Sequence, residues 1–172
     1  GLFGYTGGAA LRQVGLENVD ITGRDYVGGL VGAQYKSRVS QSYVSGSVNG
    51  EYRVGGLVGD SFANSRISQS YATAAVTGTF EVGGLVGRQN GGNISQSYAT
   101  GAVMGSGLVG GLVAYQAPSY TSITNSYWNT ETTGQATSAG GGTGLTTAQM
   151  FSANSFTGFE FGEVWGNAGD QI

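Results

Sequence analysis

The phrase VGGLVG occupies residues 27–32, 54–59 and 82–87, and it returns at residues 109–114 as VGGLVA. Successive copies begin 27, 28 and 27 residues apart. A fixed period of this length is typical of a chain that stacks copies of one structural unit on top of each other. The period of this phrase therefore predicts a repeat architecture.

A second phrase recurs at a constant distance before the first. VSQSYVSGSV, ISQSYATAAV and ISQSYATGAV begin at Val39, Ile67 and Ile94, each 15 residues before the valine of the next VGGLV. A partial copy, ITNSYWNTE, begins at Ile123, and a divergent copy fills the N-terminal residues, which makes five copies in all. The connections that follow each GLVG vary in length, as loops do and strands do not.

Within each copy the runs are short and β-branched and are broken by Gly, Ser, Thr and Asn, a pattern typical of strands and turns. We expect three short strands per copy and an all-β fold, a parallel β-helix or β-solenoid of about five 27–28-residue coils. Equivalent residues would lie about 4.8 Å apart in columns. The predicted columns are Val27, Val54, Val82 and Val109; Ile21, Val48, Val76 and Val103; and Tyr43, Tyr71, Tyr98 and Tyr127.

The paired glycines of VGGLVG have two explanations in such a stack. They allow a left-handed backbone at a corner, or they leave space for a side chain across a narrow interior. The periodicity leaves open which of Leu57 and Val58 points inward.

Residues 1–128 are predicted to form the repeat domain and residues 129–172 a C-terminal cap. Thr146 and Gln149 have the spacing of a capping box, which predicts one short helix. The aromatic residues suited to covering the last coil are Phe151, Phe156, Phe159, Phe161 and Trp165. Nothing comparable is found at the N-terminal end, which we expect to continue into further sequence or to meet a partner.

The composition argues against most catalytic chemistry. The 172 residues contain no cysteine and no histidine, so disulfides, Cys/His zinc sites and histidine acid–base catalysis are ruled out. The net charge is −3, with no basic run suited to nucleic acid. No run of 18 apolar residues is present, so we expect no membrane span. No cofactor or metal is expected.

Four specific chemistries fit the repeat poorly. VGGLVG is followed by no Lys-Ser/Thr pair, which argues against a phosphate loop. The acidic residues needed for polysaccharide cleavage scatter over repeat positions: Asp60 aligns with Arg88, and Glu81 aligns with Arg53 in a predicted ion pair between coils. A calcium-binding acidic repeat is absent, and the threonine columns are too irregular for ice binding.

The variable connections contain most of the basic residues together with several aromatic ones. This pattern predicts a basic, aromatic edge that binds an acidic glycan or an acidic protein surface. An alternative is a set of solvated loop tips whose charges discourage edge aggregation. The candidate residues are Tyr35, Lys36, Arg38, Phe62, Arg66, Arg88, Tyr115 and Tyr120.

The pairing of G-L-V-G with SQSYATG resembles the GLUG motif repeats of bacterial surface proteins, among them filamentous-haemagglutinin-like adhesins and the non-catalytic region of some immunoglobulin A peptidases. The resemblance covers roughly residues 1–130, and the tail NSYWNTETTGQATSAGGGTGLTTAQM is similar to the segment that follows the last such repeat. It implies a secreted or cell-surface β-solenoid.

We therefore expect a non-enzymatic structural or adhesive module of an exported bacterial protein. It would bind a glycan or a surface protein of a host or neighbouring cell, or act as a rigid spacer. The alternative is a filament subunit that self-associates end to end through the N-terminal coil. Neither nucleic acid nor a membrane is an expected partner.

Overall fold

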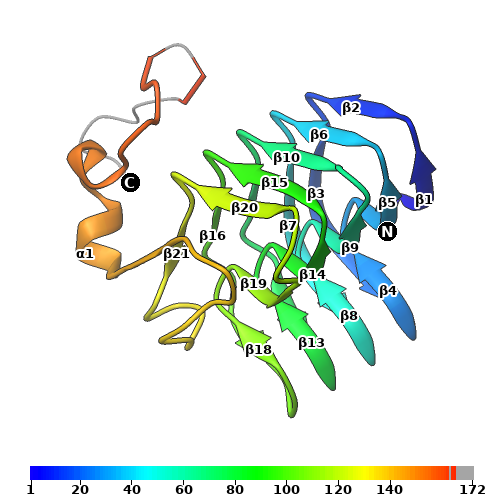
Figure 1. The fold of residues 1–172 in the computed structure, drawn as a ribbon. Helices are drawn as coiled ribbons and strands as arrows, with labels where there is room; N and C mark the ends of the chain where they lie inside the picture. The colour runs from blue at the N-terminus through cyan, green and yellow to red at the C-terminus, as the bar shows by residue number, and fades with distance from the viewer. Residues whose placement is uncertain (163, 166–172) are drawn as a thin grey trace.

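The structure is a computed structural model that describes residues 1–162 and 164–165. It is an all-β parallel solenoid of about four turns, with one short helix near its C-terminal end (Figure 1). Each turn passes through four sheets in the same order, here named A, B, C and D. The predicted fold class is therefore confirmed.

Sheets A and B each contain one strand from every turn. The strands of sheet A, in order, are β1 (Phe3–Gly7), β5 (Val31–Tyr35), β9 (Val58–Phe62), β14 (Val86–Asn90) and β19 (Val113–Gln116). The strands of sheet B are β2 (Ala10–Arg12), β6 (Arg38–Ser40), β10 (Arg66–Ser68), β15 (Gly92–Ser95) and β20 (Thr121–Thr124).

Sheet C is the longest face, and sheet D is missing from the last turn. The strands of sheet C are β3 (Gly15–Thr22), β7 (Tyr43–Asn49), β11 (Tyr71–Ala72), β12 (Ala75–Thr77), β16 (Tyr98–Ala99), β17 (Val103–Met104), β21 (Tyr127–Asn129) and β22 (Thr143–Leu145). The strands of sheet D are β4 (Asp25–Gly28), β8 (Tyr52–Gly55), β13 (Phe80–Gly83) and β18 (Val109–Gly110).

Over the residues that the structure describes, four turns are complete and a fifth ends after sheet C. The expectation of three strands per copy is wrong, because the ISQSY phrase is divided between two sheets. Gln69, in the middle of this phrase, has a φ of 50°, and this left-handed residue turns the chain from sheet B into sheet C. Gln41 and Gln96 have the same conformation at the same corner.

The predicted columns are confirmed by the strand register. Val82 pairs with Val54 on one side and with Val109 on the other. Tyr71 lies between Tyr43 and Tyr98, with ring centroids 5.0 and 4.9 Å away and the rings within 3° of parallel. Equivalent apolar residues of successive turns thus bury one another in a single continuous core.

A serine column supports the corner between sheets B and C. Ser42, Ser70 and Ser97 are buried, and the backbone N–H of each donates to the hydroxyl of the next serine along the stack, 3.2–3.3 Å away. Each hydroxyl in turn donates to the carbonyl oxygen two residues earlier. At this corner the backbone leaves the sheets, and the hydroxyl of the second serine of SQSY therefore bonds the N–H and C=O groups that no longer pair with a neighbouring strand.

The glycines of VGGLVG make room at the corner between sheets D and A. A Cβ atom on Gly56 would lie 2.3 Å from the carbonyl oxygen of Gly84 and 2.8 Å from the Cβ of Ala72. None of the glycines in the VGGLVG phrases has a left-handed φ, so the left-handed explanation is wrong and the space-making one is confirmed. Leu57 and Val58 are both fully buried in the core.

The segment after β21 covers the end of the stack. Ala139 donates its N–H to the carbonyl oxygen of Val113 at 2.9 Å, and the Trp128 indole donates to Gln135 at 2.8 Å. Helix α1 (Thr147–Met150) begins with the predicted capping box of Thr146 and Gln149, and a 3-10 turn, η1 (Ala153–Ser155), follows. The domain boundary at residue 128 stays a prediction; it falls within β21.

The aromatic residues of the C-terminal segment pack beside the tyrosine column. Phe156 and Phe159 contact Tyr127 edge-on, with ring centroids 5.0 and 5.6 Å away. Trp165 stacks on Phe159 and lies 5.6 Å from Tyr98. Residues 163 and 166–172 of the predicted cap lie outside the described residues.

Candidate functional site

The predicted basic, aromatic edge lies where sheet A turns into sheet B. Tyr35 and Phe62 end β5 and β9, and their ring centroids are 5.4 Å apart. The ammonium of Lys36 lies 5.0 Å from the centre of the Tyr35 ring. Arg38 and Arg66 begin β6 and β10, are paired in register and are both exposed. The structure thus brings five of the predicted residues together.

The other three predicted residues lie elsewhere. Tyr120 is 90% exposed in the loop before β20, beside a hollow that Asn64 and Asn90 also line. Arg88 and Tyr115 are not loop residues, because β14 and β19 extend past them. The two residues are register partners and occupy the same position in successive turns of sheet A.

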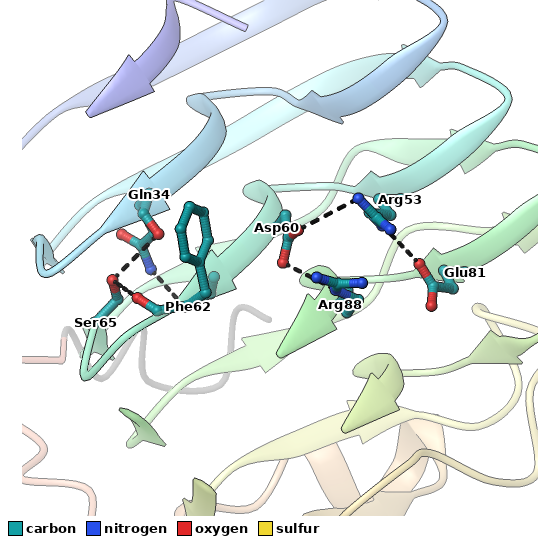
Figure 2. Close-up of polar contacts among 8 residues, drawn as sticks. Gln34, Arg53, Asp60, Phe62, Ser65, Glu81 and Arg88 are labelled. Carbon is teal, nitrogen blue, oxygen red and sulfur yellow. Dashed lines mark hydrogen bonds and ion pairs between the residues drawn. The ribbon is translucent and has the colours of Figure 1, made fainter. Parts of the chain in front are cut away.

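Four charged side chains form a network between sheets D and A (Figure 2). Arg53 of β8 contacts Glu81 of β13, with its Nε 3.1 Å from the carboxylate. Arg53 also reaches Asp60 of β9, at 3.7 Å, and Arg88 of β14 contacts the other oxygen of Asp60 at 3.3 Å. The network holds two positive and two negative charges, so it is neutral as a whole.

The strand register explains two of the three contacts in this network. Arg88 and Asp60 occupy the same position in successive turns, as do Glu81 and Arg53, so each pair lies one turn apart. The predicted Arg53–Glu81 ion pair is confirmed, and its side chains are only 26% and 11% exposed. The repeat period does not predict the contact of Arg53 with Asp60, because these residues belong to different repeat positions on different sheets.

Burial dominates the electrostatics of Asp60. Its side chain is 2% exposed, and burial raises the pKa of its carboxyl, while the charges of Arg88 and Arg53 act in the opposite direction. The carboxylate is thus held in place by two guanidinium groups. This arrangement fixes the orientation of all three side chains.

We expect the buried Asp60 to make the stability depend on pH in a defined direction. Because its folded pKa is raised, the contribution of Asp60 to the free energy of unfolding is largest below 3.8, its ordinary value, and falls as the pH rises through the folded pKa. Urea unfolding of the wild type and of Asp60→Asn between about pH 3 and 7 measures this difference. A wild type that gains stability relative to Asp60→Asn over this range would contradict the assignment.

An open groove lies beside the network. It has a volume of about 590 Å³ and is lined by Tyr5, Tyr26 and Phe62 together with Asp60 and Arg88. The rings of Tyr5 and Tyr26 are 60% and 44% exposed. The Tyr26 ring also contacts the guanidinium of Arg53, whose carbon lies 4.7 Å from the ring centre. Aromatic rings next to oriented polar groups are typical of small-molecule sites.

A second hollow continues this groove along sheet D. It has a volume of about 370 Å³ and shares Asp25 and Tyr26 with the first. Tyr52 and Phe80, which are 49% and 40% exposed, line its other part. The two hollows, named here the A–D groove, form one surface that is rich in exposed aromatic rings. The repeat pattern does not reveal this surface, because only Tyr52 and Phe80 share a repeat position and the other two rings, Tyr5 and Tyr26, occupy different ones.

The inner side of sheet A has a polar column with a structural role. Gln34 is fully buried and donates to the hydroxyl of Ser61 at 2.9 Å, and Ser65 donates to the Gln34 and Phe62 carbonyl oxygens (Figure 2). These contacts join the turns below the surface. Because they are buried, they serve the stack rather than a ligand.

No group of three or more Asp, Glu, His or Cys side chains within residues 1–162 and 164–165 is arranged to hold a metal ion. Over the same part of the chain, no helix is long and apolar enough to cross a membrane.

The stacked turns define a structural repeat module. The GLUG motif family matches residues 23–49, 50–77 and 78–104, so residues 23–104 are three consecutive GLUG repeats. The predicted GLUG-repeat region is confirmed over this range. No curated protein matches the chain.

Proposed function

We propose that this chain is a rigid, non-catalytic module of a secreted or cell-surface bacterial protein, which presents its outer faces for attachment or spaces other parts of that protein. The observation that supports this role is the continuous stack of register-matched, buried columns, of which Val54 and Val82 are members. Such a stack transmits force along its length without a flexible joint.

Two further observations support the proposal. GLUG repeats occur in bacterial surface proteins, which favours an exported location. The three acidic residues that line the A–D groove, Asp25, Asp60 and Glu81, are each paired with an arginine. A carboxylate engaged in this way is poorly placed to act as a general acid or base.

Single-molecule force spectroscopy tests the mechanical part of this role. We expect the chain, pulled from its two ends, to resist extension and then to lengthen in steps of about 90 Å. This length corresponds to the release of one turn of 27–28 residues at about 3.3 Å each. Extension without resolved force peaks, like that of an unstructured chain, would contradict the spacer role. Val82→Asp provides the control, because it should abolish the steps.

The association state distinguishes this module from a filament subunit. Sedimentation at increasing concentration should show one species if the chain works as an attachment module or spacer. Fibres that lengthen with concentration under the electron microscope would instead support end-to-end stacking through the N-terminal coil.

The predicted partners are a glycan or a surface protein of a host or neighbouring cell. Binding of the chain to immobilised glycans and to intact cells tests them.

A further inference from the structure

We propose that the A–D groove binds a neutral oligosaccharide, with its pyranose faces on the exposed tyrosine rings and its hydroxyl groups on the guanidinium of Arg88. The inference rests on the attachment role proposed above, and it places that role on a different surface from the basic edge. Three properties of the groove support it: its exposed rings, its charge balance and its fixed polar groups.

The exposed rings provide flat apolar contact surfaces. Tyr5 and Tyr26 line the first hollow, and 60% and 44% of their surface is exposed to solvent. Tyr52 and Phe80 line the second hollow and are 49% and 40% exposed. Aromatic rings pack well against the C–H face of a sugar, and a tyrosine adds a hydroxyl at the wet end of the ring. The two contiguous hollows suit a linear chain of several sugar units better than a single sugar.

The charge balance favours a neutral ligand. Asp25 is paired with Arg24 at 3.0 Å, and Asp60 and Glu81 are paired with Arg88 and Arg53. Each charge at the groove is therefore matched by an opposite one. A cationic or an anionic ligand would leave one member of a pair uncompensated, whereas sugar hydroxyls can donate to a carboxylate and accept from a guanidinium.

The polar groups are fixed before any ligand arrives. Asp60 is buried and pairs with Arg88, so it holds the Arg88 guanidinium in place beside the groove. Arg88 uses its Nε–H for Asp60, which leaves the amino groups of the planar guanidinium to face a ligand. Side chains that are already ordered lose little conformational entropy when they bind. The basic edge lacks this feature, since Arg38 and Arg66 are exposed.

A printed array of neutral glycans followed by an NMR titration tests the inference. Cellotetraose and mannotetraose represent the neutral class, tetragalacturonate the anionic class and tetralysine the cationic class. We expect at least one neutral glycan to bind and to shift the amide signals of Tyr5 and Tyr26 saturably at concentrations up to about 10 mM. The same glycan should leave the amides of Arg38 and Arg66 unshifted.

Two variants at exposed positions, one inside the groove and one outside it, keep the test independent of folding. Tyr5→Ala should weaken the binding of that glycan by about tenfold, since it removes one stacking ring. Tyr120→Ala removes an even more exposed tyrosine outside the groove and should bind like the wild type. Arg88→Lys keeps the charge but removes the planar donors, and it should weaken binding as well.

Three results would overturn the inference. These are binding of none of the neutral glycans, binding that Tyr5→Ala does not weaken, and binding in the groove by tetralysine or tetragalacturonate alone. The force measurement separates this failure from that of the proposed function. A chain that shows the force steps but binds no neutral glycan refutes the ligand and leaves the spacer role standing.

Discussion

Val82→Asp is expected to unfold the solenoid. Val82 is fully buried, and its direct neighbours along the column are Val54 and Val109. An aspartate here would place a carboxylate among apolar side chains with no cation in its column. We expect a loss of about 4 kcal/mol or more in the free energy of unfolding, which is a large part of the total stability of a domain of this size.

Circular dichroism during thermal unfolding measures this effect. Arg66→Glu is the control, because Arg66 is exposed and lies beside Arg38 in register, so the new charge removes a like-charge contact. We expect Arg66→Glu to unfold at the wild-type temperature or slightly above it. If Val82→Asp were as stable as the wild type, the column assignment would be wrong.

Gly56→Ala is expected to destabilise the fold by about 3 kcal/mol, although it adds a single methyl group. The new Cβ would lie 2.3 Å from the carbonyl oxygen of Gly84, which is backbone of the next turn and cannot rotate away. It would also lie 2.8 Å from the Cβ of Ala72 on the facing sheet. Two turns or two sheets would have to separate to admit it.

Gly4→Ala is the matched control for this substitution. A Cβ atom on Gly4 has nothing within 4 Å, and Gly4 lies in strand β1 with an ordinary φ. We expect Gly4→Ala to stay within about 0.5 kcal/mol of the wild type in urea unfolding. Equal effects of the two substitutions would show that the glycines serve backbone freedom rather than close packing.

The sequence predicted the vertical order of the fold because the repeat is nearly free of insertions inside its 15-residue block. Residues at equal positions must then lie above one another, and the structure places Tyr71 against Tyr98 as expected. The number of strands per turn was predicted wrongly. Gln69 has a left-handed backbone that ends one strand and starts another, but its place in the alternating apolar and polar pattern gives no sign of this. Secondary-structure propensities carry no information about the sign of φ at a single residue.

The candidate site was likewise predicted only in part from the sequence. The basic edge was predicted as one loop surface, and five of its residues lie together because they sit on either side of the same corner. The sequence places Arg88 in the connection of variable length that follows GLVG, yet β14 extends through this connection to Asn90. The residue type alone does not show whether a polar residue lies on the outer side of a strand or in a loop.

What the sequence determined by itself is which residues meet along the axis of the stack, because a period of 27–28 residues matches one turn and hydrogen bonding keeps neighbouring turns in register. Only the tertiary structure decided which columns meet across the axis. The glycine-lined corner folds sheet D against sheet A and thereby brings Arg53 to Asp60. This lateral contact depends on the angle of a corner, and a repeat period contains no information about that angle.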